Sequence, residues 1–162
     1  MSVTIKGGRK ISDYINKMRR EFEEAPTVLV GVPKAAGNYE DGVHTATIAS
    51  VQEYGSADGR IPERSFLRAG ISDAEGQIKK VYEKFLPEAI DGKTDMNHIQ
   101  SLVGEVAAGR IVERISEGID PANAASTVKA KGSSTPLIDT GHLRNSITYE
   151  LSAKGEDVEE GL

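Results

Sequence analysis

The chain has 162 residues and a formal net charge of −5, and it contains neither cysteine nor tryptophan. This length suits one domain with its own core, and the lack of cysteine excludes disulfides, thiolate catalysis and cysteine zinc sites. The acidic balance argues against a dedicated nucleic-acid-binding protein, while the absence of a long apolar run or a signal-like start leads us to expect neither a membrane protein nor a secreted one.

The first predicted element is an amphipathic helix over residues 9–24, followed by a buried strand over residues 27–32. Apolar residues in the helix recur every three or four positions, which places them on one stripe. Pro26 ends the helix, and β-branched residues dominate the strand. We expect the helix to cover the strand as the first layer of an α+β fold. The stripe consists of Ile11, Tyr14, Ile15, Met18 and Phe22.

A polar loop over residues 34–43 and a second helix over residues 44–54 are predicted next. Glycine tolerates the left-handed conformation of a helix C-terminus, so Gly55 suits the cap of this helix. A turn follows, and Pro62 favours an extended residue before it and a helical turn after it. That turn would place Arg64 and Arg68 on one face.

Two longer helices are predicted in the middle of the chain. Residues 72–75 (SDAE) form a capping box that is expected to start a helix ending before Pro87. The next helix, over residues 95–119, changes its apolar face near Gly104 and Gly109. The sequence leaves two explanations open: the helix kinks, or its two halves serve different partners, one of them in another subunit.

The rest of the chain is predicted as a flexible small-residue loop, a half-buried strand and an acidic tail. The loop covers residues 120–136, the strand covers residues 146–151, and the tail covers residues 155–162. The predicted fold is therefore one α+β domain over residues 1–154. It has a small mixed or antiparallel sheet packed against several amphipathic helices, with long flexible loops.

The segment Asp139-Thr140-Gly141 matches the catalytic tripeptide of aspartic proteases, in which two carboxylates share a proton at a two-fold axis. Such enzymes are nearly all-β, whereas this sequence predicts at least half helix. Asp139 also has a structural interpretation as a cap, with Gly141 allowing a tight turn. A dimeric protease using Asp139 is kept as a remote alternative.

The sequence offers no other catalytic constellation. His44, His98 and His142 lack metal-ligand spacing, and no phosphate-binding or nucleophile-elbow motif occurs. We therefore expect no catalytic, cofactor or metal site, and a protein that is not an enzyme.

Three segments in order resemble the tail-completion and head–tail joining (neck) proteins of tailed phages, of the minor tail or virion morphogenesis type. One position departs from the pattern, because Ser65 stands where many members carry proline. The resemblance covers roughly residues 45 to 150. The segments are residues 46–56 (ATIASVQEYGS), residues 61–68 (IPERSFLR), and residues 125–132 (ASTVKAKG) running into residues 136–147 (PLIDTGHLRNSI).

The resemblance implies a structural virion protein that forms a homo-oligomeric ring, expected to be a hexamer, at the head–tail junction. Its partners would be the portal-side connector or adaptor and the tail-tube or terminator proteins, with only passive contact with passing DNA. It would assemble in the bacterial cytoplasm and end in the virion. The alternative within this class is a tail terminator ring that caps the tail tube.

Residue roles follow from the matched motifs. Arginine forks suit carboxylate partners, so three arginines are candidates for inter-subunit contacts: Arg64, Arg68 and Arg144. Structural roles in turns, caps and core anchors are expected for Glu53, Tyr54, Gly55, Pro62, Phe66, Leu67, Asp139, Thr140 and Gly141.

Overall fold

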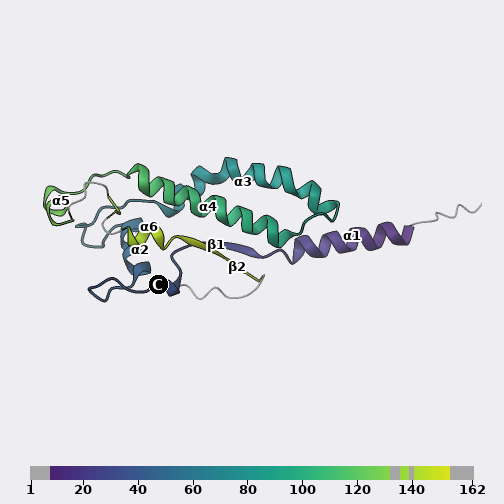
Figure 1. Ribbon diagram of the computed structural model, residues 1–162, viewed down its shortest axis with the longest axis horizontal. Helices are drawn as coiled ribbons and strands as arrows, with labels where there is room; N and C mark the ends of the chain where they lie inside the picture. Colours follow the sequence, from purple (N-terminus) through teal and green to yellow (C-terminus); the bar gives the residue numbers. More distant parts are fainter. Residues whose placement is uncertain (1–7, 132–135, 139–140, 154–162) are drawn as a thin grey trace, which may run out of the picture.

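Two long helices and a small sheet form an elongated body (Figure 1). Helices α3 (Leu67–Ile90) and α4 (Met96–Glu117) lie side by side, and strands β1 (Thr27–Gly31) and β2 (Thr148–Ser152) contact α4 from its other side. This arrangement confirms the predicted α+β class. The structure, a computed structural model, describes residues 8–131, 136–138 and 141–153.

The sheet pairs a strand near the start of the chain with the last described strand. β1 and β2 pair antiparallel, with Thr27 opposite Ser152 and Gly31 opposite Thr148. A two-stranded sheet is only marginally stable in water, so its packing on α4 supplies stability that the strand pair lacks. The prediction of strands near both positions is confirmed, although β2 begins at Thr148, two residues later than expected.

Five shorter elements complete the described structure. The first helix and the second helix lie where the sequence predicts them. The loop predicted over residues 120–136 is wrong in part, because seven of its residues form a helix at the far end of the body from α1 (Figure 1). The elements are α1 (Gly8–Glu23), the 3-10 helix η1 (Lys34–Ala36), α2 (Thr45–Tyr54), α5 (Ala125–Lys131) and α6 (His142–Asn145).

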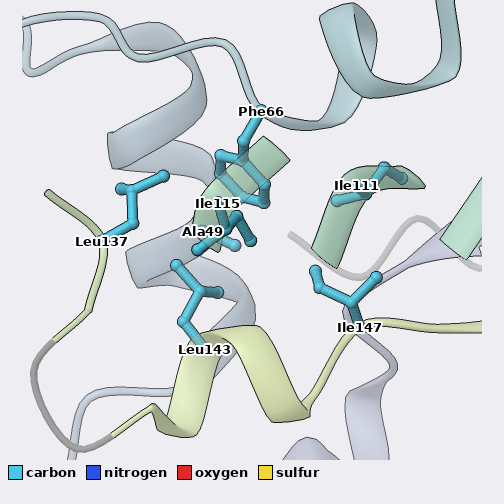
Figure 2. Close-up of a cluster of buried hydrophobic side chains, with 7 residues drawn as sticks. All are labelled: Ala49, Phe66, Ile111, Ile115, Leu137, Leu143 and Ile147. Atoms are coloured by element: carbon cyan, nitrogen blue, oxygen red, sulfur yellow. The ribbon is translucent and has the colours of Figure 1, made fainter. Parts of the chain in front are cut away.

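The core consists of two clusters at opposite ends of the α3–α4 pair. The smaller cluster lies around Ala89, Met96 and Ile99, where α3 passes into α4. The larger cluster lies where α2, α6 and the second half of α4 meet, and Figure 2 shows its side chains pointing toward one another. Its buried members are Ala49, Phe66, Ile111, Ile115, Leu137, Leu143 and Ile147.

Helix α4 keeps one buried stripe along its whole length. The predicted change of apolar face therefore needs neither a kink in the helix nor a partner in another subunit. Each residue turns a helix by about 100°, so residues four apart lie about 40° from each other around the axis. A stripe built on steps of four therefore winds slowly around the helix, and this winding looks like a change of face in the sequence. Both sides of α4 have partners within the chain, α3 on one and the sheet on the other. The stripe comprises Met96, Ile99, Val103, Ala107, Ile111 and Ile115.

Two glycines let α4 approach its neighbours closely. A Cβ added at Gly104 would lie 2.3 Å from the Cδ2 atom of Tyr149, so the aromatic ring of β2 rests directly on the helix backbone. On the other side, a Cβ at Gly70 of α3 would lie 2.7 Å from the Cγ1 atom of Ile111. Glycine at these positions therefore sets the spacing between α4 and both of its partners.

The predicted limits of the third helix are wrong at both ends. Helix α3 begins at Leu67 rather than at the capping box of residues 72–75, and it runs through Pro87 to Ile90. Proline removes one backbone donor, yet it fits inside this helix close to its C-terminal end. The early start has a different cause, a cap supplied by a residue of α2.

Helix α1 does not cover the sheet, which corrects the predicted first layer. It projects beyond the α3–α4 pair in Figure 1. Its apolar stripe stays largely exposed, with Ile11 at 61% and Ile15 at 57% of full exposure. β1 is covered by α4 instead.

Candidate functional site

The most heavily bonded side chain of the described structure is Glu53, at the end of α2. Its carboxylate is 1% exposed and accepts hydrogen bonds from three successive backbone N–H groups at the start of α3. These belong to Phe66 (2.7 Å), Leu67 (2.8 Å) and Arg68 (3.2 Å). The first N–H groups of a helix have no intrahelical partner and attract negative charge. Glu53 therefore caps α3 from another helix.

Two side chains complete this carboxylate cluster. The Ser65 hydroxyl donates to Glu53 at 2.8 Å, and the Arg68 Nε donates to it at 2.8 Å. Serine at position 65, where many members of the resembling family carry proline, thus adds a donor to the carboxylate. Arg68 also reaches Glu63 at 2.7 Å, and its guanidinium carbon lies 4.7 Å from the centre of the Tyr54 ring. These contacts join the segment of residues 46–56 to the segment of residues 61–68.

The ionisation of Glu53 is set by two opposing effects. Burial raises the pKa of Glu53, but hydrogen bonds from Arg68, Leu67 and Ser65 together outweigh it. The net pKa lies below the ordinary value of 4.5. The carboxylate is therefore charged at neutral pH, and its charge is what the cap requires.

This lowered pKa predicts a loss of stability in acid. A carboxyl group whose pKa is lower in the folded state stabilises the fold above its unfolded-state pKa. That contribution disappears as the pH falls below 4.5 and through the folded-state pKa of Glu53. Urea unfolding at pH 7 and pH 3 would measure it, and the Glu53→Gln variant should lose less stability than the wild type over this range. An equal loss in both proteins would contradict the assignment.

The turn between the two motifs depends on Gly55. Its φ of 80° and ψ of 169° lie in a region essentially confined to glycine. A Cβ there would lie 3.0 Å from the Glu63 nitrogen and 3.0 Å from the Ile61 oxygen. The predicted glycine cap is confirmed, but its ψ differs from the left-handed helical conformation that the sequence led us to expect. Pro62 follows in an exposed stretch without regular secondary structure, so the helical turn predicted to start at Pro62 is wrong.

Arg64 lies inside the chain, which corrects its prediction as a surface contact. It is 6% exposed, and its guanidinium donates to the carbonyl oxygens of Pro121 (2.8 Å) and Ala122 (3.4 Å) and to the side chain of Gln52 (3.3 Å). Burial lowers the pKa of Arg64. Because residues 62–65 belong to no helix, Arg64 and Arg68 do not share a helix face. Arg64 instead fixes the segment that follows α4.

The second segment (residues 61–68) and the third (residues 136–147) both contribute to the larger core cluster. Phe66 is fully buried there, and Leu67 packs against the cluster, as predicted for both. Leu137 is also buried, although its φ of 63° is unusual for a residue other than glycine. Gly141 has a φ of 81° and precedes α6, which agrees with its predicted role in a turn.

The remaining predicted residues are placed only in part. Asp139 and Thr140 lie outside the described residues, as does the acidic tail. Arg144 is half-buried on α6, and its Nη2 atom lies 3.5 Å from the position that a Cβ of Gly141 would take. Arg68 remains accessible, since 54% of its side chain is exposed. Of the three predicted interface arginines, Arg68 therefore has the most accessible side chain.

A second polar contact, which the sequence did not indicate, joins the third motif to α2. The buried Thr45 hydroxyl donates to the Gly37 carbonyl at 2.9 Å and lies 2.9 Å from the His142 Nε2 atom. The rings of Tyr39 and His142 pack in a T-shaped arrangement, with 4.8 Å between the ring centres. A threonine at the first position of a helix is an ordinary signal, so this contact became visible only in three dimensions.

The part of the chain that the structure describes contains no group of three or more His, Cys, Asp or Glu side chains arranged to hold a metal ion. Among the described helices, none is long and apolar enough to cross a membrane. Comparisons with protein-family models, curated proteins and solved structures found no match to this chain.

Proposed function

We propose that this chain is a structural subunit of a tailed-phage particle, forming a homo-oligomeric ring at the head–tail junction. The ring would join the connector to the tail and complete the DNA conduit. Support comes from the resemblance of residues 46–56, 61–68 and 125–147 to neck proteins, and from what these segments do in the fold.

The observation that carries the proposal is the convergence of these segments on one buried unit. Glu53 of the first segment caps the helix that begins in the second. Ala49 of the first, Phe66 of the second and Leu143 of the third belong to the same core cluster (Figure 2). Residue patterns that together build a core are typical of a structural signature, whereas catalytic residues converge on an accessible site.

The architecture also favours this proposal over the aspartic-protease hypothesis. The described residues form six α-helices and two strands, one 3-10 helix aside, while a protease of that type needs β-rich lobes around its paired carboxylates. The residues flanking Asp139 in the described structure, Leu137 and Leu143, point into the core (Figure 2). That environment suits a structural turn.

Disruption of the gene in the phage or prophage that encodes it tests the proposed role. We expect DNA-filled heads and separate tails to accumulate, and the wild-type gene supplied in trans to restore joined particles. Electron microscopy of lysates measures both. Tails of abnormal length would favour the terminator alternative, and normal infectious particles would refute a role in assembly.

Asp139→Asn separates the structural hypothesis from the enzymatic one. A structural turn keeps a side-chain acceptor in asparagine, so the variant should restore joined particles as well as the wild type does. A shared-proton protease would lose its activity with this change. A purified dimer that cleaves peptides, and stops doing so in the variant, would replace the proposed function.

A further inference from the structure

Helix α1 lies at one end of the molecule (Figure 1), and its apolar stripe is largely exposed. Four large side chains on it remain 40 to 61% exposed. Together they expose apolar surface on the order of 400 Å², within the range of the largest apolar patches of soluble monomers, which are often functional. These side chains are Ile11, Tyr14, Ile15 and Phe22.

The contacts that α1 makes within the chain leave this stripe open. The Tyr14 hydroxyl donates to the Ile90 carbonyl at the end of α3, which positions the helix beside the α3–α4 turn. The pairs Lys17–Glu21 and Arg19–Glu23 lie along the helix itself. The apolar spacing of three and four residues is the pattern of a helix that docks into a groove of a partner.

A second exposed apolar group lies at the opposite end of α3. Tyr54 is 63% exposed, Ile71 39% and Ile61 36%. They surround the capped start of the helix: Arg68 stacks on Tyr54, Ile71 follows Arg68 by three positions, and the Ile61 oxygen lies beside Gly55. A helix of 24 residues is about 36 Å long, so this group and α1 are well separated.

We propose that the α1 stripe of one copy docks on the Tyr54–Ile61–Ile71 group of the next copy. Two different surfaces at opposite ends of a subunit give a head-to-tail contact rather than a two-fold dimer, and such a contact builds a ring when the rotation between copies closes. This inference rests on the proposed ring function and names the surfaces that build it. A stable interface buries about 800 Å² on each partner, so the stripe is one part of a larger contact.

Charge supports a second copy as the occupant. Helix α1 contains five basic and three acidic residues, a formal charge of +2, whereas residues 24–153 contain thirteen basic and eighteen acidic residues, a formal charge of −5. A basic amphipathic helix also suits an anionic membrane surface. The acidic remainder of the same chain opposes that membrane contact and favours a neighbouring copy.

Cysteine cross-linking tests the docking directly, because the wild-type chain contains no cysteine. Full-length Ile15→Cys protein is mixed with full-length Ile71→Cys protein and treated with a short bismaleimide. We expect cross-linked dimers in the mixture and few with either protein alone. Glu83→Cys, an exposed position on α3, is the matched control and should not cross-link to Ile15→Cys. Dimers from Ile15→Cys alone would overturn the proposal in favour of paired α1 helices.

A second variant separates this inference from the proposed function. Ile15→Asp places a carboxylate in the docked stripe and should weaken self-association at least about tenfold. Because Ile15 is exposed within the single chain, the thermal midpoint of this variant should stay close to that of the wild type. Native mass spectrometry measures the assembly. A wild-type ring that persists in Ile15→Asp would overturn the α1 contact and leave the ring intact as a proposal.

The remaining outcomes also decide between the alternatives. A wild-type protein that forms no ring, alone or with purified tails, would overturn both the inference and the proposed function. Binding of the wild type, but not of Ile15→Asp, to phosphatidylglycerol–phosphatidylethanolamine vesicles, without cross-linking between copies, would show that a membrane occupies the stripe.

Discussion

Replacing Glu53 by glutamine is expected to lower the free energy of unfolding by about 2–4 kcal/mol, because buried backbone donors lose their charged acceptor. Glutamine keeps the shape of the side chain but turns one acceptor into an NH₂ group, and in either orientation this group faces backbone N–H donors, those of Phe66 and Leu67 or that of Arg68. Most of the expected loss comes from these donors. Arg68 is 54% exposed and returns to solvent at little cost.

Glu63→Gln is the matched control for this prediction. Glu63 pairs with the same arginine at 2.7 Å, but its side chain is 57% exposed and it caps no helix. Exposed ion pairs contribute about 0–1 kcal/mol, so this variant should stay within that range. Urea unfolding of both variants at pH 7 provides the comparison. Similar losses would mean that the Arg68 ion pair, rather than the cap, carries the stability.

The substitution Gly104→Ala is expected to cost about 1–3 kcal/mol, the typical penalty for overpacking. The new methyl group would lie within 2.3 to 2.9 Å of three atoms of the Tyr149 ring. The ring is attached to β2, so relief requires moving the strand away from α4. Because β2 pairs only with β1 among the described strands, that movement would disturb the whole sheet.

Gly109 provides the opposite result on the same helix. A Cβ at Gly109 meets nothing within 4 Å, and alanine favours a helix interior by about 1 kcal/mol over glycine. Gly109→Ala should therefore raise the thermal midpoint while Gly104→Ala lowers it. Combining Gly104→Ala with Tyr149→Leu should recover part of the loss if the ring is the obstacle. Additive effects in the double variant would place the cost elsewhere.

The sequence predicted the regular elements well where a periodic apolar pattern ran between clear ends. The helices around Ile11 and Ile99 and the strand at Val28 were placed within a few residues. The start of α3 was missed because its cap is remote: the local capping box at residues 72–75 was a stronger sequence signal than a glutamate fourteen positions before Leu67. Non-local caps leave no local pattern.

The sequence identified several residues of the candidate site but did not predict which residues contact one another. Glu53 was expected to end a helix, and its role as the acceptor for α3 required the three-dimensional turn at Gly55. Arg64 was predicted as an inter-subunit contact because arginine forks suit carboxylate partners. The carbonyls that hold it belong to residues 121 and 122, which the sequence presents only as part of a loop.

The pairing of β1 with β2 has a consequence for synthesis on the ribosome. Thr27 leaves the exit tunnel long before its partner Ser152 exists, so β1 emerges with both edges open. Helices α3 and α4 can associate earlier, since their contacts are close in sequence. Helix α4 is therefore folded against α3 before the strand pair can form on its other side. During that interval the apolar run of residues 27–32 is open to chaperones and to aggregation.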